Sequence, residues 1–254
     1  MNKQNDIKAV ILAAGKGKRL GSEETGIAKA MREAAGKPLL SWVLSALDFI
    51  SPKDTVIVVG FKKQTIIEAF PGCIFAEQTE QLGTGHAAAC AAALLNGWEG
   101  SVLICCGDMP LIEKSTYEAL CQTHRLSGYA CTILTCVYPD CLPYGRIVTA
   151  RDGSFKGIVE QKDCTPQEDA IREYNSGVYV FSAPILAEAL ALLKNDNAQG
   201  EYYLTDVPGI IRLSGHSIGT YKMESADELL GVNTIEDLRK VEDILLKKRH
   251  NSKI

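Results

Sequence analysis

The sequence has no long apolar run, no surplus of positive charge and few aromatic side chains. The apolar segment nearest the N-terminus, AVILAAG, is too short for a membrane span or for the core of a signal peptide. The 27 Lys and Arg residues face 31 Asp and Glu residues, and aromatic residues make up only 7% of the chain, which argues against a nucleic-acid-binding surface. We therefore expect a cytoplasmic protein that binds neither membranes nor nucleic acid.

Histidine is also scarce, whereas cysteine is abundant. The chain has nine cysteines, an odd number scattered through apolar segments, which is not the pattern of a disulfide framework. Cys131, Cys136 and Cys141 recur at every fifth residue, but these gaps and the lack of a nearby histidine disfavour a zinc site. The sequence predicts reduced, mostly buried thiols.

Apolar segments rich in β-branched residues alternate with helical patterns through the first half of the chain. The strand-like segments AVILAAG, TVIVVG, CIFAEQ and SVLICCGD are apolar without a break, which indicates that both faces of the sheet are covered. The 254 residues suffice for one such domain. We predict an α/β fold with a doubly wound, mostly parallel, Rossmann-like sheet.

The rhythm changes after the helix expected near Thr116 to Leu126. The segments CTILTCVYP, RIVTARDG, FKGIVEQ and YNSGVYVFSA follow one another with only turns between them, which predicts an added antiparallel portion that faces the loop after the first predicted strand. A charged amphipathic helix, TIEDLRKVEDILLKK, follows near the C-terminus. We expect one domain with a first portion at about 5–110, a second portion at about 111–232, and a C-terminal helix at 233–254.

A loop rich in glycine and lysine follows the first predicted strand. In LAAGKGKRLGSEETGIAK, Gly15 and Gly17 allow backbone N–H groups to close around phosphate oxygens, while lysine and arginine side chains supply positive charge. Neither the GxxxxGK[ST] phosphate loop nor a complete dinucleotide fingerprint is present. The loop predicts a phosphate site of another kind, although a solvated basic turn has the same local pattern.

A second polar segment follows the strand VLICC. Asp108 stands at the carboxyl end of this strand, where open α/β sheets bind their ligands. A carboxylate there is suited to Mg²⁺, which prefers carboxylate, phosphate and water oxygens. The alternative is that Asp108 only orders the turn before Pro110.

Taken in order, these segments resemble the nucleotidyltransferase domain of the bacterial N-acetylglucosamine-1-phosphate uridylyltransferases, within the sugar-phosphate nucleotidyltransferase family. LAAGKGKRL is similar to the family's LAAGxGTRM loop, EQLGTGHA to its central motif and CCGDMPLI to its YGDxPLI strand end. YGRI, IVEQKD, NSGVY, NAQGEYYLTD and GVNT follow in the family's order. The resemblance covers most of the chain but no hexapeptide-repeat β-helix, so acetyltransferase activity is not expected.

The resemblance implies that the portion at about 5–110 binds the nucleotide and that the portion at about 111–232 binds the sugar phosphate. It also implies roles for individual residues. Arg19 and Lys29 would act in catalysis, and Asp108 and Asn233 would bind Mg²⁺. The remaining implied contacts are with the nucleotide, by Leu12, Ala13, Ala14, Gly15, Gln78, Gly83, Thr84 and Gly107, and with the sugar phosphate, by Gly145, Glu160 and Asn175.

Each implied role has a plainer local alternative. Gln78 could be a strand-end surface residue, Asn175 a turn former and Asn233 a helix cap. Tyr202 and Tyr203 of NAQGEYYLTD, which resembles a segment supporting the sugar pocket, could serve only as core packing.

The implied reaction joins UTP and N-acetylglucosamine 1-phosphate into UDP-N-acetylglucosamine, with release of pyrophosphate. The attacking phosphate is already ionised near neutral pH and needs no general base, so the four histidines, His86, His124, His216 and His250, are interpreted as structural or solvated. One alternative is the same reaction with another sugar 1-phosphate or NTP. A second is a non-catalytic regulatory protein that binds sugar nucleotides. The sequence indicates no oligomeric state.

The chain departs from the family pattern in and near the phosphate loop. Lys18 stands where the family usually has threonine, Ala28 where proline precedes the lysine, and Cys106 where an aromatic residue precedes Gly107. The segment GSEETGIA also makes the loop longer before Lys29. Catalysis is sensitive to displacements of about 1 Å, so these departures matter chiefly through the position that they give to Lys29.

Overall fold

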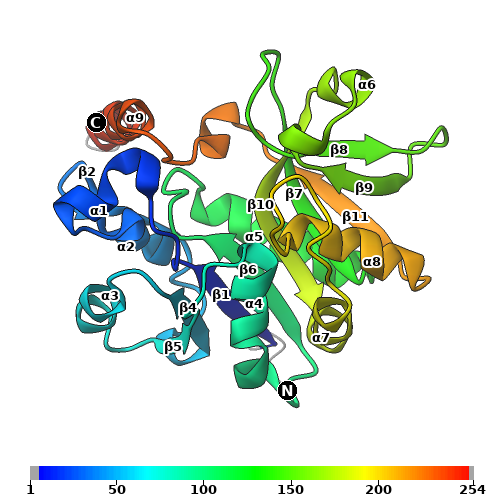
Figure 1. Cartoon of the computed structure of the whole chain (residues 1–254), viewed down its shortest axis with the longest axis horizontal. Helices are drawn as coiled ribbons and strands as arrows, with labels where there is room; N and C mark the ends of the chain where they lie inside the picture. Colours follow the sequence, from blue (N-terminus) through cyan, green and yellow to red (C-terminus); the bar gives the residue numbers. More distant parts are fainter. Residues whose placement is uncertain (1–5, 252–254) are drawn as a thin grey trace.

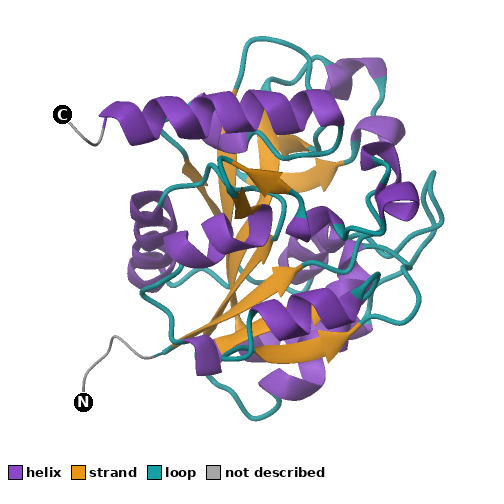
Figure 2. Cartoon of the chain, turned by 90° about the vertical axis from the view of Figure 1, so that its left-hand side faces the viewer, coloured by secondary structure: helices purple, strands orange, loops and turns teal. Residues whose placement is uncertain are grey.

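The computed structural model describes residues 6–251, which form a central sheet with helices on both faces (Figures 1 and 2). The strands are β1 (Ile7–Leu12), β2 (Glu33–Ala34), β3 (Lys37–Pro38), β4 (Thr55–Val59), β5 (Ile74–Glu77), β6 (Ser101–Cys106), β7 (Cys131–Val137), β8 (Arg146–Thr149), β9 (Phe155–Val159), β10 (Glu173–Ser182) and β11 (Ile218–Lys222). The α-helices are α1 (Ser22–Thr25), α2 (Leu39–Ala46), α3 (Lys63–Ala69), α4 (Thr84–Ala92), α5 (Lys114–Ser127), α6 (Pro166–Asp169), α7 (Ala183–Ala191), α8 (Val207–Leu213) and α9 (Ile235–Asn251).

The main sheet runs in the order β11-β7-β10-β6-β1-β4-β5, with β8 and β9 branching from β10. β6, β1, β4 and β5 are parallel neighbours, whereas β10 is antiparallel to β6, β7 and β8. The predicted α/β fold, with a parallel centre and an added antiparallel portion, is confirmed. β11, parallel to β7, and the small β2–β3 hairpin were not predicted.

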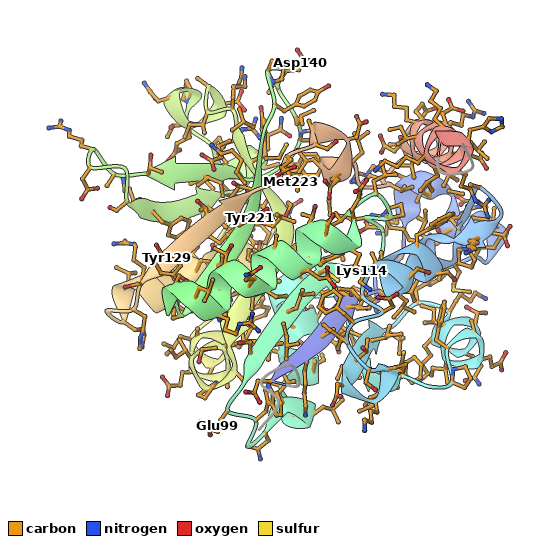
Figure 3. All side chains as sticks on the ribbon, turned by 180° about the vertical axis from the view of Figure 1, so that it is seen from behind. Glu99, Lys114, Tyr129, Asp140, Tyr221 and Met223 are labelled. Atoms are coloured by element: carbon orange, nitrogen blue, oxygen red, sulfur yellow. The ribbon has the colours of Figure 1, made fainter. Side chains whose placement is uncertain are left out.

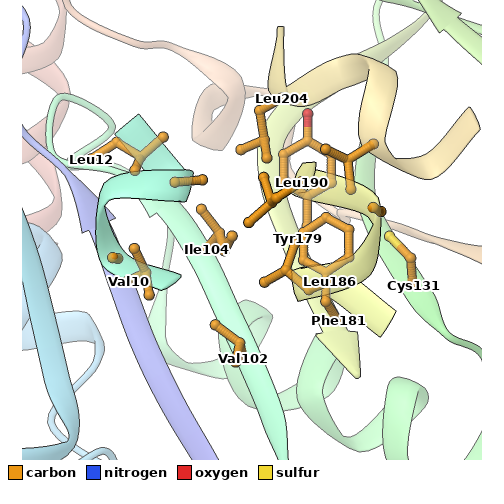
Figure 4. Close-up of a cluster of buried hydrophobic side chains, with 14 of the residues drawn as sticks. Val10, Leu12, Val102, Ile104, Cys131, Tyr179, Phe181, Leu186, Leu190 and Leu204 are labelled. Atoms are coloured by element: carbon orange, nitrogen blue, oxygen red, sulfur yellow. The ribbon is translucent and has the colours of Figure 1, made fainter. Parts of the chain in front are cut away.

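Alternate residues of each parallel strand enter different cores. Val10 and Leu12 of β1 pack under α4, α7 and α8, while Ala9 and Ile11 point to the face covered by α2, α3 and α5. Figure 4 shows the first core, where Val102 and Ile104 of β6 meet Leu186 and Leu190 of α7. The unbroken apolar strands therefore reflect burial on both faces.

The opposite face is crossed by α5, which Figure 3 shows from behind, with Lys114 near its start and Tyr129 just beyond its end. His124, in the last turn of α5, is 6% exposed, and its Nδ1 lies 3.0 Å from Thr132 Oγ1 of β7. The expectation that His124 is a structural histidine fits this contact, although the sequence offered no evident partner. Among residues 6–251, no helix is long and apolar enough to cross a membrane.

The cysteines were expected to be reduced and mostly buried. All nine are free thiols, but only Cys105, Cys131 and Cys136 are fully buried, five are half-buried and Cys141 is exposed. Burial raises the pKa of the Cys121 thiol to about 12 and does the same for Cys106, with a smaller contribution from the nearby Asp108 carboxylate. Burial of these thiols favours their protonated form.

Candidate active site

A cavity of about 280 Å³ opens at the carboxyl ends of β1, β5 and β6. Parallel strands end at the same edge of a sheet, so the segments that follow them meet there. Its walls include ten residues predicted as site residues, namely Leu12, Ala13, Ala14, Gly15, Lys29, Gln78, Gly83, Thr84, Gly107 and Asp108. The structure thus brings the predicted nucleotide-binding residues into one cavity.

Lys29, Asp108 and Asn233 form the polar centre of this site. The Lys29 ammonium group pairs with the Asp108 carboxylate and donates a hydrogen bond to Asn233 Oδ1 at 2.8 Å. The side chains of Lys29 and Asp108 are 19% and 20% exposed, so the ion pair remains accessible from the cavity. Three residues that are remote in sequence therefore converge on one point.

The Asn233 side chain is placed by bonds from both of its flanks. The Val232 amide donates to the carbonyl oxygen of Asp108 at 3.0 Å, which ties the GVNT segment to the end of β6. Asp237 Oδ2 accepts from the amides of Asn233 and Thr234, at 3.0 and 2.8 Å. Thr234, not Asn233, caps α9, since its Oγ1 accepts from the Asp237 amide at 3.1 Å. The Asn233 side chain is aimed at Lys29 instead.

Two side-chain oxygens, one from a carboxylate and one from an amide, converge on a single positive charge. This donor set fits a divalent cation that prefers oxygen, and the ammonium group of Lys29 marks the point at which the two oxygens meet. Within residues 6–251 no cluster of three or more His, Cys, Asp or Glu side chains could hold a metal ion. A cation here would therefore take its other ligands from substrate phosphates and water.

The longer phosphate loop folds into two short helical turns and still delivers Lys29 to the site. Arg32 closes this segment by donating to the carbonyl oxygens of Leu20 and Gly21 and, at 2.9 Å, to Thr25 Oγ1. Gly17 has a φ of 64°, and a Cβ there would lie 2.9 Å from the Cβ of Lys29. Gly17 therefore permits the close packing of this loop, whereas Gly15 has open space around it.

Arg19 does not join Lys29. It lines a second, larger cavity of about 930 Å³ together with Lys16, Lys18 and Lys162, and Glu160 lies in the same wall. Gln81 and Glu201 line both cavities, so the two spaces are neighbours. The sequence analysis missed Gln81 and Glu201, although each is a polar residue within a motif that it had singled out.

Gly145, Glu160 and Asn175 come together at one end of the β8–β9 hairpin. The Asn175 amide donates to the Gly145 carbonyl oxygen at 2.9 Å, and Arg146 pairs with Val159, which places Gly145 beside Glu160. Burial raises the pKa of Glu160, and the hydrogen bond from Thr205 Oγ1 at 3.0 Å acts in the opposite direction. The three predicted sugar-side residues are therefore neighbours.

Asn175 lines neither cavity, since its side chain is turned inward. It is 5% exposed, its Nδ2 donates to the Tyr179 hydroxyl at 2.8 Å, and its Oδ1 accepts from the Gly177 amide at 3.2 Å. Asn175 lies within β10, at the start of the irregularity in its pairing with β7, and its side chain bonds within that strand.

The segment NAQGEYYLTD joins the two portions of the site. The Gly85 amide donates to the Tyr202 carbonyl oxygen at 2.7 Å, and the Tyr202 amide donates to that of Leu82 at 2.8 Å. A Cβ on Gly83, whose φ is 111°, would lie 2.5 Å from the Tyr202 oxygen. The glycines of LGTGHA are thus required by this close backbone approach.

Comparison with known proteins gives one family. The family described as the MobA-like NTP transferase domain matches residues 9–202 of this chain. Three relatives named "Bifunctional protein GlmU" are similar: 42% identical over 94% of this chain in Pelobacter propionicus, 43% over 90% in Geobacter metallireducens, and 41% over 96% in Lactococcus lactis subsp. lactis. The matches cover 52%, 48% and 52% of those relatives, so the chain spans about half their length.

Proposed function

The chain belongs to the MobA-like NTP transferase family, and from this premise we propose that it transfers a uridylyl group from UTP to N-acetylglucosamine 1-phosphate, releasing pyrophosphate. The observation that carries the proposal is the convergence of Lys29, Asp108 and Asn233 at the mouth of a cavity walled by the predicted nucleotide loop. The similarity to GlmU proteins over most of this chain supports the choice of substrates.

The central difficulty of this reaction is charge. An oxygen of the sugar phosphate forms a bond to the α-phosphorus of UTP, the bond from that phosphorus to the bridging oxygen breaks, and pyrophosphate leaves. Lys29 supplies a fixed positive charge beside the first cavity, and Arg19 and Lys18 supply more in the second. Preorganised cations stabilise the charge that develops on the phosphates without reorganising during the reaction.

Asp108 and Asn233 would hold Mg²⁺, the ion we propose for this site. Bound Mg²⁺ would neutralise phosphate charge and hold the two substrates in register. The role of the protein is to fix the two oxygens, through the Val232 backbone bond to Asp108 and the Asp237 cap of the Asn233 segment.

Glu160, with Gly145 and Thr205 around it, is proposed to contact the sugar. Its carboxylate faces the second cavity and is held by Thr205, which suits it to accept hydrogen bonds from sugar hydroxyl groups. We propose that Gln78, Gly83 and Thr84 contact the base, since all three line the first cavity.

The test is pyrophosphate release from UTP and N-acetylglucosamine 1-phosphate with Mg²⁺, compared with a panel of other NTPs and sugar 1-phosphates. The proposed pair should give the highest kcat/KM of the panel. A different best pair would replace the substrate assignment. Nucleotide binding without turnover for every pair, unchanged by Asp108→Ala, would instead favour a regulatory protein that binds sugar nucleotides.

A further inference from the structure

His86 lies behind the wall of the first cavity and contacts the residue that faces the base. Gln78 follows β5, is 3% exposed and lines the cavity. Its Nε2 donates to the Gly83 carbonyl oxygen at 3.0 Å and lies 3.1 Å from His86 Nδ1. His86 itself is half-buried in the first turn of α4.

The two contacts fix the direction of the Gln78 amide. A carbonyl oxygen only accepts hydrogen bonds, so the amide nitrogen has to face Gly83. The second N–H of the amide then points to His86 Nδ1, which must accept it, and the imidazole proton must lie on Nε2. Nε2 faces Cys90 Sγ at 3.9 Å.

The amide oxygen is the part of Gln78 that remains available. Within residues 6–251, no side chain or backbone amide donates a hydrogen bond to Gln78 Oε1. Because Gln78 lines the cavity and its nitrogen is engaged by Gly83 and His86, the group that remains for a ligand is a hydrogen-bond acceptor.

We propose that His86 is a positioning residue that selects the base through Gln78. With Nδ1 as acceptor behind it, the Gln78 amide keeps Oε1 toward the nucleotide and favours a base that offers a ring N–H there. The imide of uracil or thymine has that N–H, whereas the corresponding ring nitrogen of cytosine is an acceptor and would meet Oε1 unfavourably. This inference rests on the proposed function.

The surroundings hold the imidazole in place. The loop before it is pinned by the Tyr202 backbone through Leu82 and Gly85. The Tyr202 ring packs obliquely near the imidazole, with 6.4 Å between ring centroids. His86 therefore has a fixed position from which its Nδ1 can act on Gln78.

The experiment compares His86→Leu with His86→Asn. Leucine provides no acceptor, whereas the asparagine side chain can place Oδ1 where Nδ1 of histidine lies. We expect His86→Leu to lower the ratio of kcat/KM for UTP to that for CTP about tenfold, mainly through a higher KM for UTP. His86→Asn should restore most of the ratio, and His216→Leu, at an exposed turn, should leave it unchanged.

Two further measurements separate this inference from a packing effect and from the function itself. If His86 acts through Gln78, His86→Leu should have no further effect on the ratio in a Gln78→Ala background. The same ratio, measured as UTP and CTP affinities by calorimetry, tests the inference even if no sugar phosphate is turned over. An unchanged ratio in His86→Leu, or equal losses in the leucine and asparagine variants, would overturn it.

Discussion

The parallel half of the sheet and its antiparallel half use their polar side chains in different ways. In the parallel half, Lys29 and Asp108 pair at the open mouth of a cavity, each about one fifth exposed. In the antiparallel half, Arg146 is fully buried, and its guanidinium group bonds to the carbonyl oxygens of Leu142 and Tyr144 and to Asp169. The charged groups of the first arrangement remain accessible to a ligand. The guanidinium group of the second is hydrogen-bonded within the protein and is not accessible.

We expect the two halves to contribute differently to catalysis and to stability. Groups that face the cavity are expected to matter for turnover and little for folding, because water already solvates them. Groups that are bonded within the antiparallel half are expected to matter for stability, because their removal leaves buried partners without hydrogen bonds.

The largest expected effect is that of Asp108→Asn on activity. Asparagine removes the negative charge of Asp108, the only charge on the two oxygen groups, and the ion-pair partner of Lys29, so kcat/KM should fall by about a thousandfold. The midpoint of thermal unfolding should change by less than about 3 °C. Pyrophosphate release and differential scanning fluorimetry measure the two quantities, with Asp152→Asn in the exposed β8–β9 turn as control. A large loss of stability in Asp108→Asn would contradict the expectation that groups facing the cavity matter little for folding.

Arg146→Met is expected to show the reverse pattern. The methionine fills most of the arginine volume but leaves the carbonyl oxygens of Leu142 and Tyr144 without their donor, which should cost about 3 kcal/mol of unfolding free energy. Urea unfolding monitored by circular dichroism measures this cost. Arg172→Met, at a more exposed guanidinium group, serves as control and should cost less than about 1 kcal/mol. Equal costs in the two variants would show that burial of Arg146 does not decide its contribution.

The same contrast explains which parts of the molecule the sequence predicted. The parallel strands and the residues after them were predicted because each strand is an unbroken apolar run and its polar residue follows directly. β11 was missed because Ile218–Lys222 is short and mixed in polarity, and its partner β7 lies more than 80 residues earlier. Local pattern carries no information about such a distant partner.

The contact between His86 and Gln78 was missed for a similar reason. His86 lies in the first turn of α4, and its contact with Gln78 is defined by the path of the loop between the two residues. That path depends on the Tyr202 backbone, which is more than 100 residues away. The position of Arg19 in the second cavity likewise depends on how the longer loop folds.

The burial of His124, in α5 against β7, also predicts a dependence on pH. Burial lowers the pKa of His124 to about 4 from its usual value near 6.5. Between these values the unfolded chain binds a proton that the folded chain does not, so stability is fully present above about pH 6.5 and falls as the pH drops toward 4. On lowering the pH from 7 to 4.5, the wild type should lose about 2 kcal/mol more unfolding free energy than His124→Gln.

Urea unfolding of both proteins across this pH range isolates the contribution of His124, because the buried carboxyl groups are common to the two. Glutamine is chosen because its amide can retain a hydrogen bond to Thr132, the partner of Nδ1. Parallel curves for the two proteins would show that the buried imidazole contributes nothing to acid sensitivity.

The smallest expected effect is that of Lys18→Thr, which restores the residue usual in the family. Lys18 is exposed in the second cavity beside Lys16 and Arg19, so it adds positive charge to this cavity. Its removal should raise the KM for UTP about threefold at low salt, and the difference should shrink as salt screens the charge. Lys53→Thr, on the exposed segment before β4, should change neither the KM for UTP nor its dependence on salt. A threefold effect that persists at high salt would mean that Lys18 makes a fixed contact with the nucleotide. The charges that face the cavity would then act through fixed contacts, as the bonded groups of the antiparallel half do.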